Sequence, residues 1–496
     1  MIASTIEAAL RSGHGRRIAI DDGVHALSHE ELADRAAEEG DWLAGLGERF
    51  ALLSDNGIGW ALTDLALHIR RLTGIPLPGY FTTSQILHAL DDAGVDCVLT
   101  DDPGRMRGVL QGWATSGASG RTGLVAFRRG LDPFARPTLP WGTAKVTYTS
   151  GSTAQPRGVC LSALQLESVA RSLADATANL DVERHLCLMP LATLLENVGG
   201  IYAPLLAGAR CLVPSSAETG MSYARPDARR LLGCVSRARP ESLILVPELL
   251  KLLVSAAESG WRPPGTLRFI AVGGAPVAVE MLKRAAALGL PVFEGYGLSE
   301  CASVVCLNTP EGCRPGSVGR PLPHARVRVA DDGQLMVSGV TMLGYLGDSS
   351  RGEDEEWPTG DLGEMDADGY LYVRGRLRNV YITSLGRNVA PEWVEREILQ
   401  HPGIRHAMVH GEARPYAVAI VSAPPETTDA ASIDRAVARA NAKLPDYAQV
   451  RRWVRAPEPF SFGNGLLTSN GRLRRTEILQ RHGALLDALY REEIAS

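Results

Sequence analysis

Hydrophobic and polar positions alternate between helical and strand-like patterns in the first part of the chain. Apolar residues recur with helical spacing over Ser28–Leu46, and the segment opens on Ser-His-Glu-Glu, a capping-box pattern. Short apolar runs at Arg49–Leu53 and Asp96–Thr100 predict buried strands, with a second helix between them over Trp60–Arg71. This alternation predicts α/β architecture, with parallel sheets covered by helices on both faces.

The same pattern returns later in the chain and then changes. Further strands are expected at Cys187–Met189, Arg210–Val213, Ser242–Val246 and Phe269–Val272. Between Gly319 and Val340 the strands become short and bounded by glycine, which predicts a small barrel or an antiparallel sheet.

The C-terminal region reads as a separate α+β unit. A strand at Leu371–Arg378 ends in a Gly-Arg-rich turn, and strands and helices of its own follow: 407–409, 417–421, 433–442 and 476–490. We therefore expect an N-terminal domain over residues 1–377 and a smaller domain over residues 378–496.

Composition and charge exclude several classes. The chain has 496 residues, of which 45% are hydrophobic and 22% charged, as in globular proteins of more than one domain. A net charge of -5 argues against a large nucleic-acid surface. No window suggests an integral membrane segment, and the N-terminal basic residues follow the apolar stretch instead of preceding it. With 8 cysteines and no CxxC pair, we expect reduced thiols and a cytoplasmic location.

The segment Val146–Val159 suits a polyphosphate. An apolar strand runs into a glycine- and hydroxyl-rich loop, in which Gly151 lets the backbone approach a ligand closely. Arg157 adds positive charge, and the pattern is not a Walker A loop. The hydroxyl groups of the loop are those of Thr149, Ser150, Ser152 and Thr153.

Two further segments could complete a nucleotide site. In Phe293–Glu300 an aromatic, Tyr296, stands between two glycines and can lie against a base, while Glu300 could hold Mg²⁺. The strand-to-glycine turn Ala271–Pro276 could border the same nucleotide. Farther on, Asp361 can accept from both hydroxyls of a ribose.

Arg376 lies close enough in sequence to reach the same sugar as Asp361. A glycine-containing loop then leads into a helix within Ile382–Glu395, which begins at Pro391.

These segments, in this order, resemble the ANL superfamily of adenylate-forming enzymes over nearly the whole chain. The resemblance is closest to long-chain fatty acyl-CoA synthetases, through three motifs: Thr-Ser-Leu-Gly-Arg-Asn-Val, Pro-Glu-Trp-Val-Glu and Asn464–Thr468. The resemblance implies a large N-terminal domain of αβ subdomains plus a small barrel, and a small mobile C-terminal domain. It also implies that ATP and a carboxylic acid give an acyl-adenylate and pyrophosphate, and that a thiol then attacks the adenylate.

The resemblance also implies roles for individual residues. Nucleotide contacts fall to Thr149, Ser150, Gly151, Ser152, Thr153, Arg157, Gly273, Gly274, Ala275, Pro276, Glu294, Gly295, Tyr296, Gly297, Ser299, Asp361, Arg376 and Arg387. Catalytic roles fall to Thr149, Ser299, Glu300, Arg387 and Arg472, with Glu300 as the Mg²⁺ ligand. Gly386 would border the thiol tunnel, and Arg378 stands at the hinge position.

Four positions depart from the family pattern. Arg472 replaces the C-terminal catalytic lysine, Arg157 the loop lysine, Ala154 a loop glycine and Thr193 a histidine near the acyl pocket. Arginine keeps the charge of lysine but is planar and multidentate. Three outcomes stay open for Arg472: retained activity, slower adenylation with intact thioester formation, or loss of ligase activity.

The expected acyl pocket is apolar. An aspartate that amino-acid-activating relatives use is missing near Thr193, which argues against an amino acid substrate. The apolar lining candidates, each of which could instead be a core residue, are Leu194, Leu195, Val198, Ile201 and Val246, and Thr193 is placed in the same pocket.

The expected activity is ATP- and Mg²⁺-dependent activation of a small-molecule carboxylic acid, of medium or long aliphatic chain. Transfer to CoA would follow. One alternative is loading of the phosphopantetheine of an acyl carrier protein. The other is a degenerate nucleotide- or acyl-binding homologue without turnover, suggested by Arg472.

Overall fold

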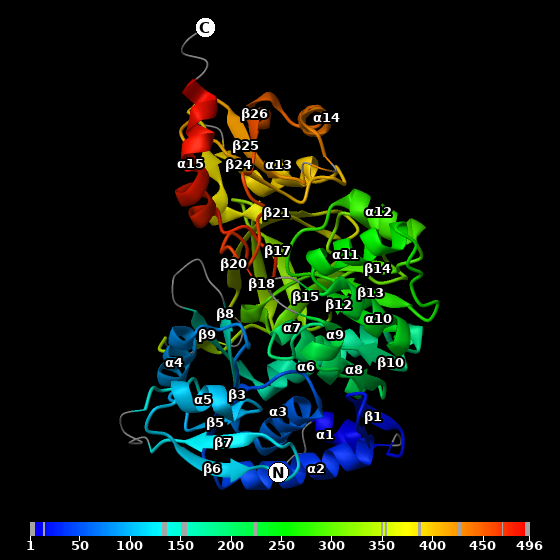
Figure 1. Cartoon of the computed structure of the whole chain (residues 1–496), viewed down its shortest axis with the longest axis vertical. Coiled ribbons are helices and arrows are strands. Elements are labelled where there is room, and N and C mark those ends of the chain that lie inside the picture. Colours follow the sequence, from blue (N-terminus) through cyan, green and yellow to red (C-terminus); the bar gives the residue numbers. More distant parts are fainter. Residues whose placement is uncertain are drawn as a thin grey trace.

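The computed structural model describes residues 5–12, 15–130, 136–149, 156–221, 226–348, 351–352, 355–384, 388–424, 426, 428–468 and 470–491 (Figure 1). The described elements form two large sheets, a four-stranded sheet and a C-terminal domain, which stands at the top of the view. The chain is therefore mixed α/β, with the expected large N-terminal part and smaller C-terminal domain.

The first large sheet has nine strands and is parallel in its centre. In spatial order they are β16 (Arg320–Pro321), β15 (Ser303–Leu307), β14 (Val292–Leu298), β13 (Phe269–Val272), β12 (Ser242–Leu245), β10 (Arg184–Leu186), β11 (Arg210–Leu212), β1 (Ile18–Asp21) and β2 (Ala26–Ser28). The helices associated with it in sequence are α9 (Ser216–Thr219), α10 (Ala228–Ala238), α11 (Pro247–Glu258) and α12 (Val279–Ala287). The expected strand at 187–189 lies instead at Arg184–Leu186.

The second large sheet has eight strands. Their order is β19 (Gly344–Tyr345), β9 (Arg157–Ser162), β8 (Thr143–Thr149), β4 (Thr73–Pro76), β3 (Arg49–Leu53), β5 (Cys97–Thr100), β7 (Val125–Arg128) and β6 (Ala114–Ala118). Helices α4 (Thr83–Asp92) and α5 (Pro103–Val109) belong to this part of the chain.

Helices between the two large sheets form a shared core. The set comprises α1 (Thr5–Leu10), α2 (His29–Ala44), α3 (Ile58–Arg70), α6 (Ala163–Ala176), α7 (Leu194–Glu196), a π-helix (Asn197–Tyr202) and α8 (Ala203–Leu206). Ile20 of one sheet and Phe50 of the other belong to one buried cluster with Leu32, Leu65 and Leu166 of these helices. Helix α2 begins with the predicted capping box, in which Ser28 and Glu31 bond each other's backbone.

The region after Gly319 forms an antiparallel sheet of four strands. These are β17 (Ala325–Val329), β18 (Gln334–Gly339), β20 (Trp357–Met365) and β21 (Leu371–Arg376). Strands β17 and β21 lie at the two edges of the sheet. Of the two expected forms, a small barrel or an antiparallel sheet, the structure has the antiparallel sheet.

The C-terminal domain packs helices on both faces of a three-stranded sheet. Its elements are β24 (His406–His410), β25 (Ala417–Ser422), β26 (Val450–Arg455), α13 (Pro391–Ile398), α14 (Ala430–Asn441) and α15 (Arg475–Arg491), preceded by the short pair β22 (Tyr381–Ile382) and β23 (Asn388–Val389). Ala407 and Val409 pack with α13 and α14, whereas Met408 packs with α15. This alternation is the two-residue period of a strand buried on both sides.

All eight cysteines are free thiols, and seven of them are buried. Among the residues that the structure describes, no helix is long and apolar enough to cross a membrane.

Candidate nucleotide site

The predicted phosphate loop connects two strands of the second sheet. Thr149 ends β8, Arg157 begins β9, and the two residues are partners in the antiparallel register. The loop candidates Ser150, Gly151, Ser152 and Thr153 lie outside the described residues, as does Ala154.

Arg157 is linked to Glu300 through an aromatic residue that the sequence analysis did not select. The Arg157 guanidinium lies 3.7 Å from the ring centre of Tyr345 and its Nη2 is 2.9 Å from Asp348 Oδ2. The Tyr345 hydroxyl donates to Glu300 Oε1 at 2.8 Å. Nothing but a Gly-Tyr pair marks Tyr345 in the sequence, and only the pairing of β19 with β9 brings it here.

Glu300 has a carboxylate oxygen available to bind Mg²⁺. It lies with Ser299 in a short 3-10 turn directly after β14, and both are partly exposed. Tyr345 occupies one carboxylate oxygen, and within the described part of the chain no hydrogen bond engages the other. A partly exposed carboxylate oxygen is the hard ligand that Mg²⁺ prefers.

The glycine turns at the ends of β13 and β14 allow two backbones to approach closely. A Cβ on Gly273 would lie 3.3 Å from the carbonyl oxygen of Gly295, and one on Gly297 only 1.7 Å from that of Ser303. Gly274 has a φ of +87°, which favours glycine. Ala275 is partly exposed and Pro276 exposed at the same edge.

Glu294 lies below these turns, inside the protein. Burial raises its pKa to about 7, and Gly316 N donates to its Oε2 at 3.3 Å. Its side chain is therefore buried beneath the turn, and its contact with a nucleotide stays a prediction.

Asp361 and Arg376, the two predicted ribose ligands, lie side by side on adjacent strands. They are direct partners in the register of β20 and β21, and Arg376 Nε is 2.9 Å from Asp361 Oδ1. Tyr296 Oη donates to Asp361 Oδ2 at 2.7 Å. We call Tyr296, Asp361 and Arg376 the ribose cluster; its aromatic ring and buried carboxylate are held in fixed positions by these bonds.

Arg472 reaches this cluster from the C-terminal domain. Its Nε donates to the carbonyl of Gly274, and its backbone N donates to Thr468 Oγ1 at 3.1 Å. Burial and the positive charge of Arg376 lower the pKa of Arg472 to about 10, so it is still a cation at neutral pH. The residue at the position of the catalytic lysine thus lies in the predicted site.

Arg378, the predicted hinge residue, lies in the described part of the chain, and its charge acts on Arg376, Asp361 and Arg472. Arg378 lies in a 3-10 turn (Leu377–Asn379) directly after β21. Gly386 and Arg387 fall outside the described residues. Their roles at the hinge, the thiol tunnel and the phosphates stay predictions.

The acyl-pocket candidates are mainly core residues in this structure. Thr193 precedes α7, and its hydroxyl donates to Pro190 O at 2.7 Å. Leu194, Leu195 and Val198 pack in the shared core, whereas Val246 belongs to a second cluster. Val246 Cγ1 lies 3.8 Å from the ideal Cβ position of Gly274, which puts Val246 beside the nucleotide turn.

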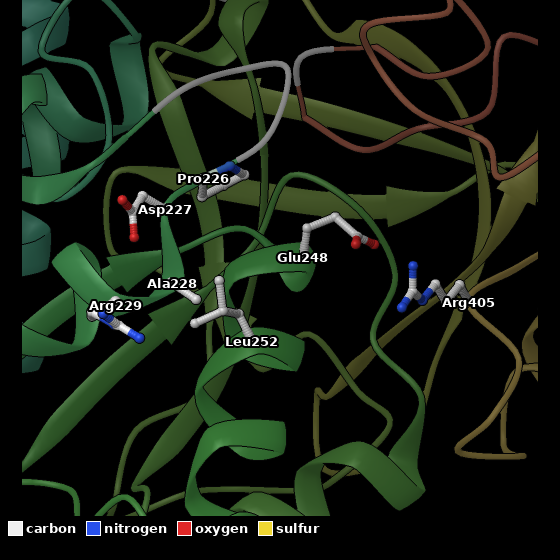
Figure 2. Close-up of a pocket in the computed structure, with 7 residues that line it drawn as sticks. All are labelled: Pro226, Asp227, Ala228, Arg229, Glu248, Leu252 and Arg405. Carbon is white, nitrogen blue, oxygen red and sulfur yellow. The ribbon is translucent and has the colours of Figure 1, made fainter. Parts of the chain in front are cut away.

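A cavity of about 670 Å³ lies between the first large sheet and the C-terminal domain (Figure 2). In the close-up Glu248 of α11 and Arg405 extend toward each other across it. It is lined by Pro226, Asp227, Ala228, Arg229, Glu248, Leu252 and Arg405.

Contacts beside this cavity join the two domains. Lys251 Nζ donates to Arg405 O at 2.9 Å, and His406 Nε2 is 3.3 Å from Glu248 Oε1. The cavity also borders the Arg472 turn, because a Cβ on Gly471 would lie 3.1 Å from Glu248 Cγ. Sequence analysis did not identify this interface, since its residues are far apart in the chain.

Comparisons with known proteins agree with this geometry. Residues 7–346 match the model of the AMP-binding enzyme family, and residues 379–494 match the C-terminal domain of AMP-binding enzymes. A long-chain-fatty-acid–CoA ligase of Mycobacterium bovis is 25% identical over 90% of this chain and 88% of its own length. A feruloyl-CoA synthase of Amycolatopsis is 28% identical, over 94% of this chain and 96% of its own.

Solved structures share the fold across the whole chain. The anthranilate CoA ligase AuaEII in complex with anthranoyl-AMP has a TM-score of 0.78 at 19% identity, with 98% of each chain covered. The o-succinylbenzoate CoA synthetase of Bacillus subtilis with ATP and a magnesium ion has a TM-score of 0.73 at 22% identity, covering 96% of this chain and 98% of its own. The chain therefore belongs to the AMP-binding enzymes, the ANL superfamily of adenylate-forming proteins.

Proposed function

We propose that this enzyme activates a carboxylic acid with ATP to an acyl-AMP and pyrophosphate, and then transfers the acyl group to CoA. The observation that carries the proposal is the ribose cluster with Arg472 beside it. Arg472, a cation from the second domain, contacts the Gly274 turn and lies near Asp361, the carboxylate that we propose binds the ribose. The names of the relatives support a CoA-dependent second half.

The residues present can carry the first step. Asp361 would accept from the ribose hydroxyls, and Tyr296 would lie along the base, so that both fix the α-phosphorus for attack by the acid. Arg472 and Arg376 would stabilise the charge that develops on the phosphate oxygens. Mg²⁺ held at Glu300 would neutralise charge on the phosphates.

For the acid we propose a medium or long aliphatic chain. The side chains of Leu194, Leu195 and Val246 are apolar, which suits an acyl chain. Curated relatives are named for fatty, ferulic and succinylbenzoic acids, so an aryl acid is the competing substrate class.

For the second step we propose that residues 378–496 turn as a unit about Arg378. In the present arrangement Arg472 occupies the site, and Lys251, Glu248 and His406 hold the domains together. These polar contacts, and those of Glu280 N with Gln400 Oε1 and of Arg396 Nη2 with Val373 O, would have to break before a thiol could approach the adenylate near Gly386.

The test is pyrophosphate release with ATP, Mg²⁺ and a panel of aliphatic and aryl acids, each with and without CoA. We expect release that depends on an aliphatic acid and rises with CoA. Release without stimulation by CoA would favour a carrier-protein acceptor, and a preference for aryl acids would contradict the substrate class.

One observation supports a second candidate, a nucleotide-binding homologue with little turnover. The guanidinium of Arg472 is engaged by the Gly274 carbonyl, so part of its donor capacity is already used. Arg472→Lys distinguishes the two: a large gain in pyrophosphate release over a nearly silent wild type would favour the binding homologue.

A further inference from the structure

Three side chains of metal-binding type are buried together away from the nucleotide site. His185 lies in β10, Cys187 directly follows that strand, and Glu196 ends α7. One ligand atom from each lies within 4.8 Å of the others, and all three residues are buried. Residues two apart along a strand face the same side, so β10 presents His185 and Cys187 together toward Glu196.

Three polar atoms of this cluster lack hydrogen-bond partners among the described residues, whereas Cys187 Sγ donates to the carbonyl of Gly200 at 3.3 Å. His185 Nε2 and both carboxylate oxygens of Glu196 are buried without a hydrogen bond. The nearest approach, from His185 Nε2 to Glu196 Oε1, is 3.5 Å. Buried polar groups are nearly always satisfied, so an orphaned imidazole nitrogen facing an orphaned carboxylate requires an explanation.

The surroundings orient His185 and leave its Nε2 facing Glu196. His185 Nδ1 lies 2.8 Å from Ser242 Oγ, and donation to that hydroxyl leaves the Nε2 lone pair free. A Cβ on Gly200 would lie 2.6 Å from Glu196 Oε1 and 3.1 Å from His185 Nε2, so only glycine leaves both atoms unobstructed.

We propose that His185, Cys187 and Glu196 bind one structural Zn²⁺ ion. An imidazole nitrogen, a thiolate and a carboxylate form a mixed donor set typical of zinc. Binding forms a zinc–sulfur bond at Cys187 and releases the thiol proton to solvent. Cys211, the register partner of His185 on β11, would supply the fourth ligand.

The ion would tie the first large sheet to the helical segment beside the predicted acyl pocket. Glu196 directly precedes the π-helix Asn197–Tyr202, which includes Val198. Because the site is closed, the metal would enter during folding and not by exchange with the folded protein.

The experiment measures metal content, which does not depend on ligase activity. Full-length protein folded with Zn²⁺ and freed of loose metal should retain about one zinc per chain by mass spectrometry. Cys187→Ser and Glu196→Gln should lower the zinc content at least tenfold, whereas Cys234→Ser, at a buried cysteine of α10, should keep it.

A second measurement covers variants that fail to fold. Wild-type protein refolded with Co²⁺ should show the sulfur-to-cobalt absorption of a thiolate ligand. Wild-type protein without zinc and without that absorption would overturn the proposal, leaving a protonated Glu196 that donates to His185. Equal zinc in all variants would place the ion elsewhere and overturn it as well.

Discussion

At the scale of single residues, the proposed role of Asp361 can be tested through the KM for ATP. Its two oxygens accept from Tyr296 and Arg376, and its carboxylate is the proposed ribose ligand. Asp361→Asn removes the charge and one acceptor, so we expect the KM for ATP to rise about tenfold to a hundredfold. Steady-state pyrophosphate release measures it.

The matched control for that change is Asp368→Asn. Asp368 is an exposed carboxylate paired with Arg314, away from the ribose cluster. We expect its KM for ATP to stay within about twofold of wild type, since exposed ion pairs contribute little. An unchanged KM in Asp361→Asn would contradict the ribose assignment.

A substitution of Arg472 measures how much the C-terminal domain contributes to acyl-AMP formation. Its guanidinium bonds the Gly274 carbonyl and lies near Asp361 and Arg376. If it stabilises charge in the transition state, Arg472→Ala should lower kcat for acyl-AMP formation about a hundredfold. ATP–pyrophosphate exchange follows this half-reaction alone.

Arg474→Ala is the control for Arg472→Ala. Arg474 lies two positions along and pairs with Glu477 at the surface. Its exchange rate should match wild type; equal losses in both variants would show a general effect on the domain and not a role for Arg472.

At the scale of elements, the antiparallel pairing of β14 with β15 depends on Gly297. A Cβ there would lie 1.7 Å from the carbonyl oxygen of Ser303, and that atom belongs to backbone which cannot rotate away. Gly297→Ala should therefore reduce the free energy of unfolding by about 2–3 kcal/mol, measured by denaturant titration.

Gly108→Ala, a substitution within a helix, is the control for Gly297→Ala. Gly108 lies in α5, and its added Cβ meets nothing within 4 Å. It should be neutral or stabilise by about 0.5 kcal/mol, because alanine restricts the unfolded chain. If both variants were equally stable, β14 and β15 would have to be less closely packed than described.

The elements also show what hydrophobic patterns can and cannot predict. The patterns located β3 and β13 to the residue, and α2 by its capping box. They misplaced β10 by three positions, because Cys187–Met189 is apolar and buried yet follows the strand, whereas the strand itself contains Arg184 and His185. An apolar run indicates that a segment is buried, but around β10 the buried residues and the hydrogen-bonded strand residues are not the same.

The contacts in the nucleotide site were predictable only where the residues lie close together in the sequence. Asp361 and Arg376 lie on adjacent strands joined by a short turn, so their meeting follows from local sequence. Tyr345, by contrast, reaches Glu300 only because β19 pairs with β9, far away in the chain. Contacts between distant segments leave no periodic signal in the sequence.

At the scale of the whole molecule, the contact between the domains contains a titratable group, His406. It lies beside Glu248, Lys251 and Arg405. Burial lowers its pKa, and the cations Lys251 and Arg405 act in the same direction, while Glu248 opposes them. Burial raises the pKa of Glu248, but His406 and Lys251 outweigh it and lower that pKa overall.

These shifts predict that stability falls on mild acidification. The folded protein disfavours protonated His406, so the unfolded chain binds more protons there, and the contribution is lost as the pH falls below about 6.5. The contribution of Glu248 has the same sign but is lost only at more acid pH, below the ordinary carboxylate range. Between pH 8 and pH 5, His406 should therefore account for about 1 kcal/mol of the change.

His406→Gln should flatten this pH dependence, because glutamine does not titrate. The measurement is the thermal midpoint of wild type and variant at several pH values between 8 and 5. His25→Gln, at an exposed histidine beside Asp22, should retain the wild-type slope. If His406→Gln kept that slope too, the acid sensitivity would arise from other histidines, and docking of the C-terminal domain would not depend on the charge of His406.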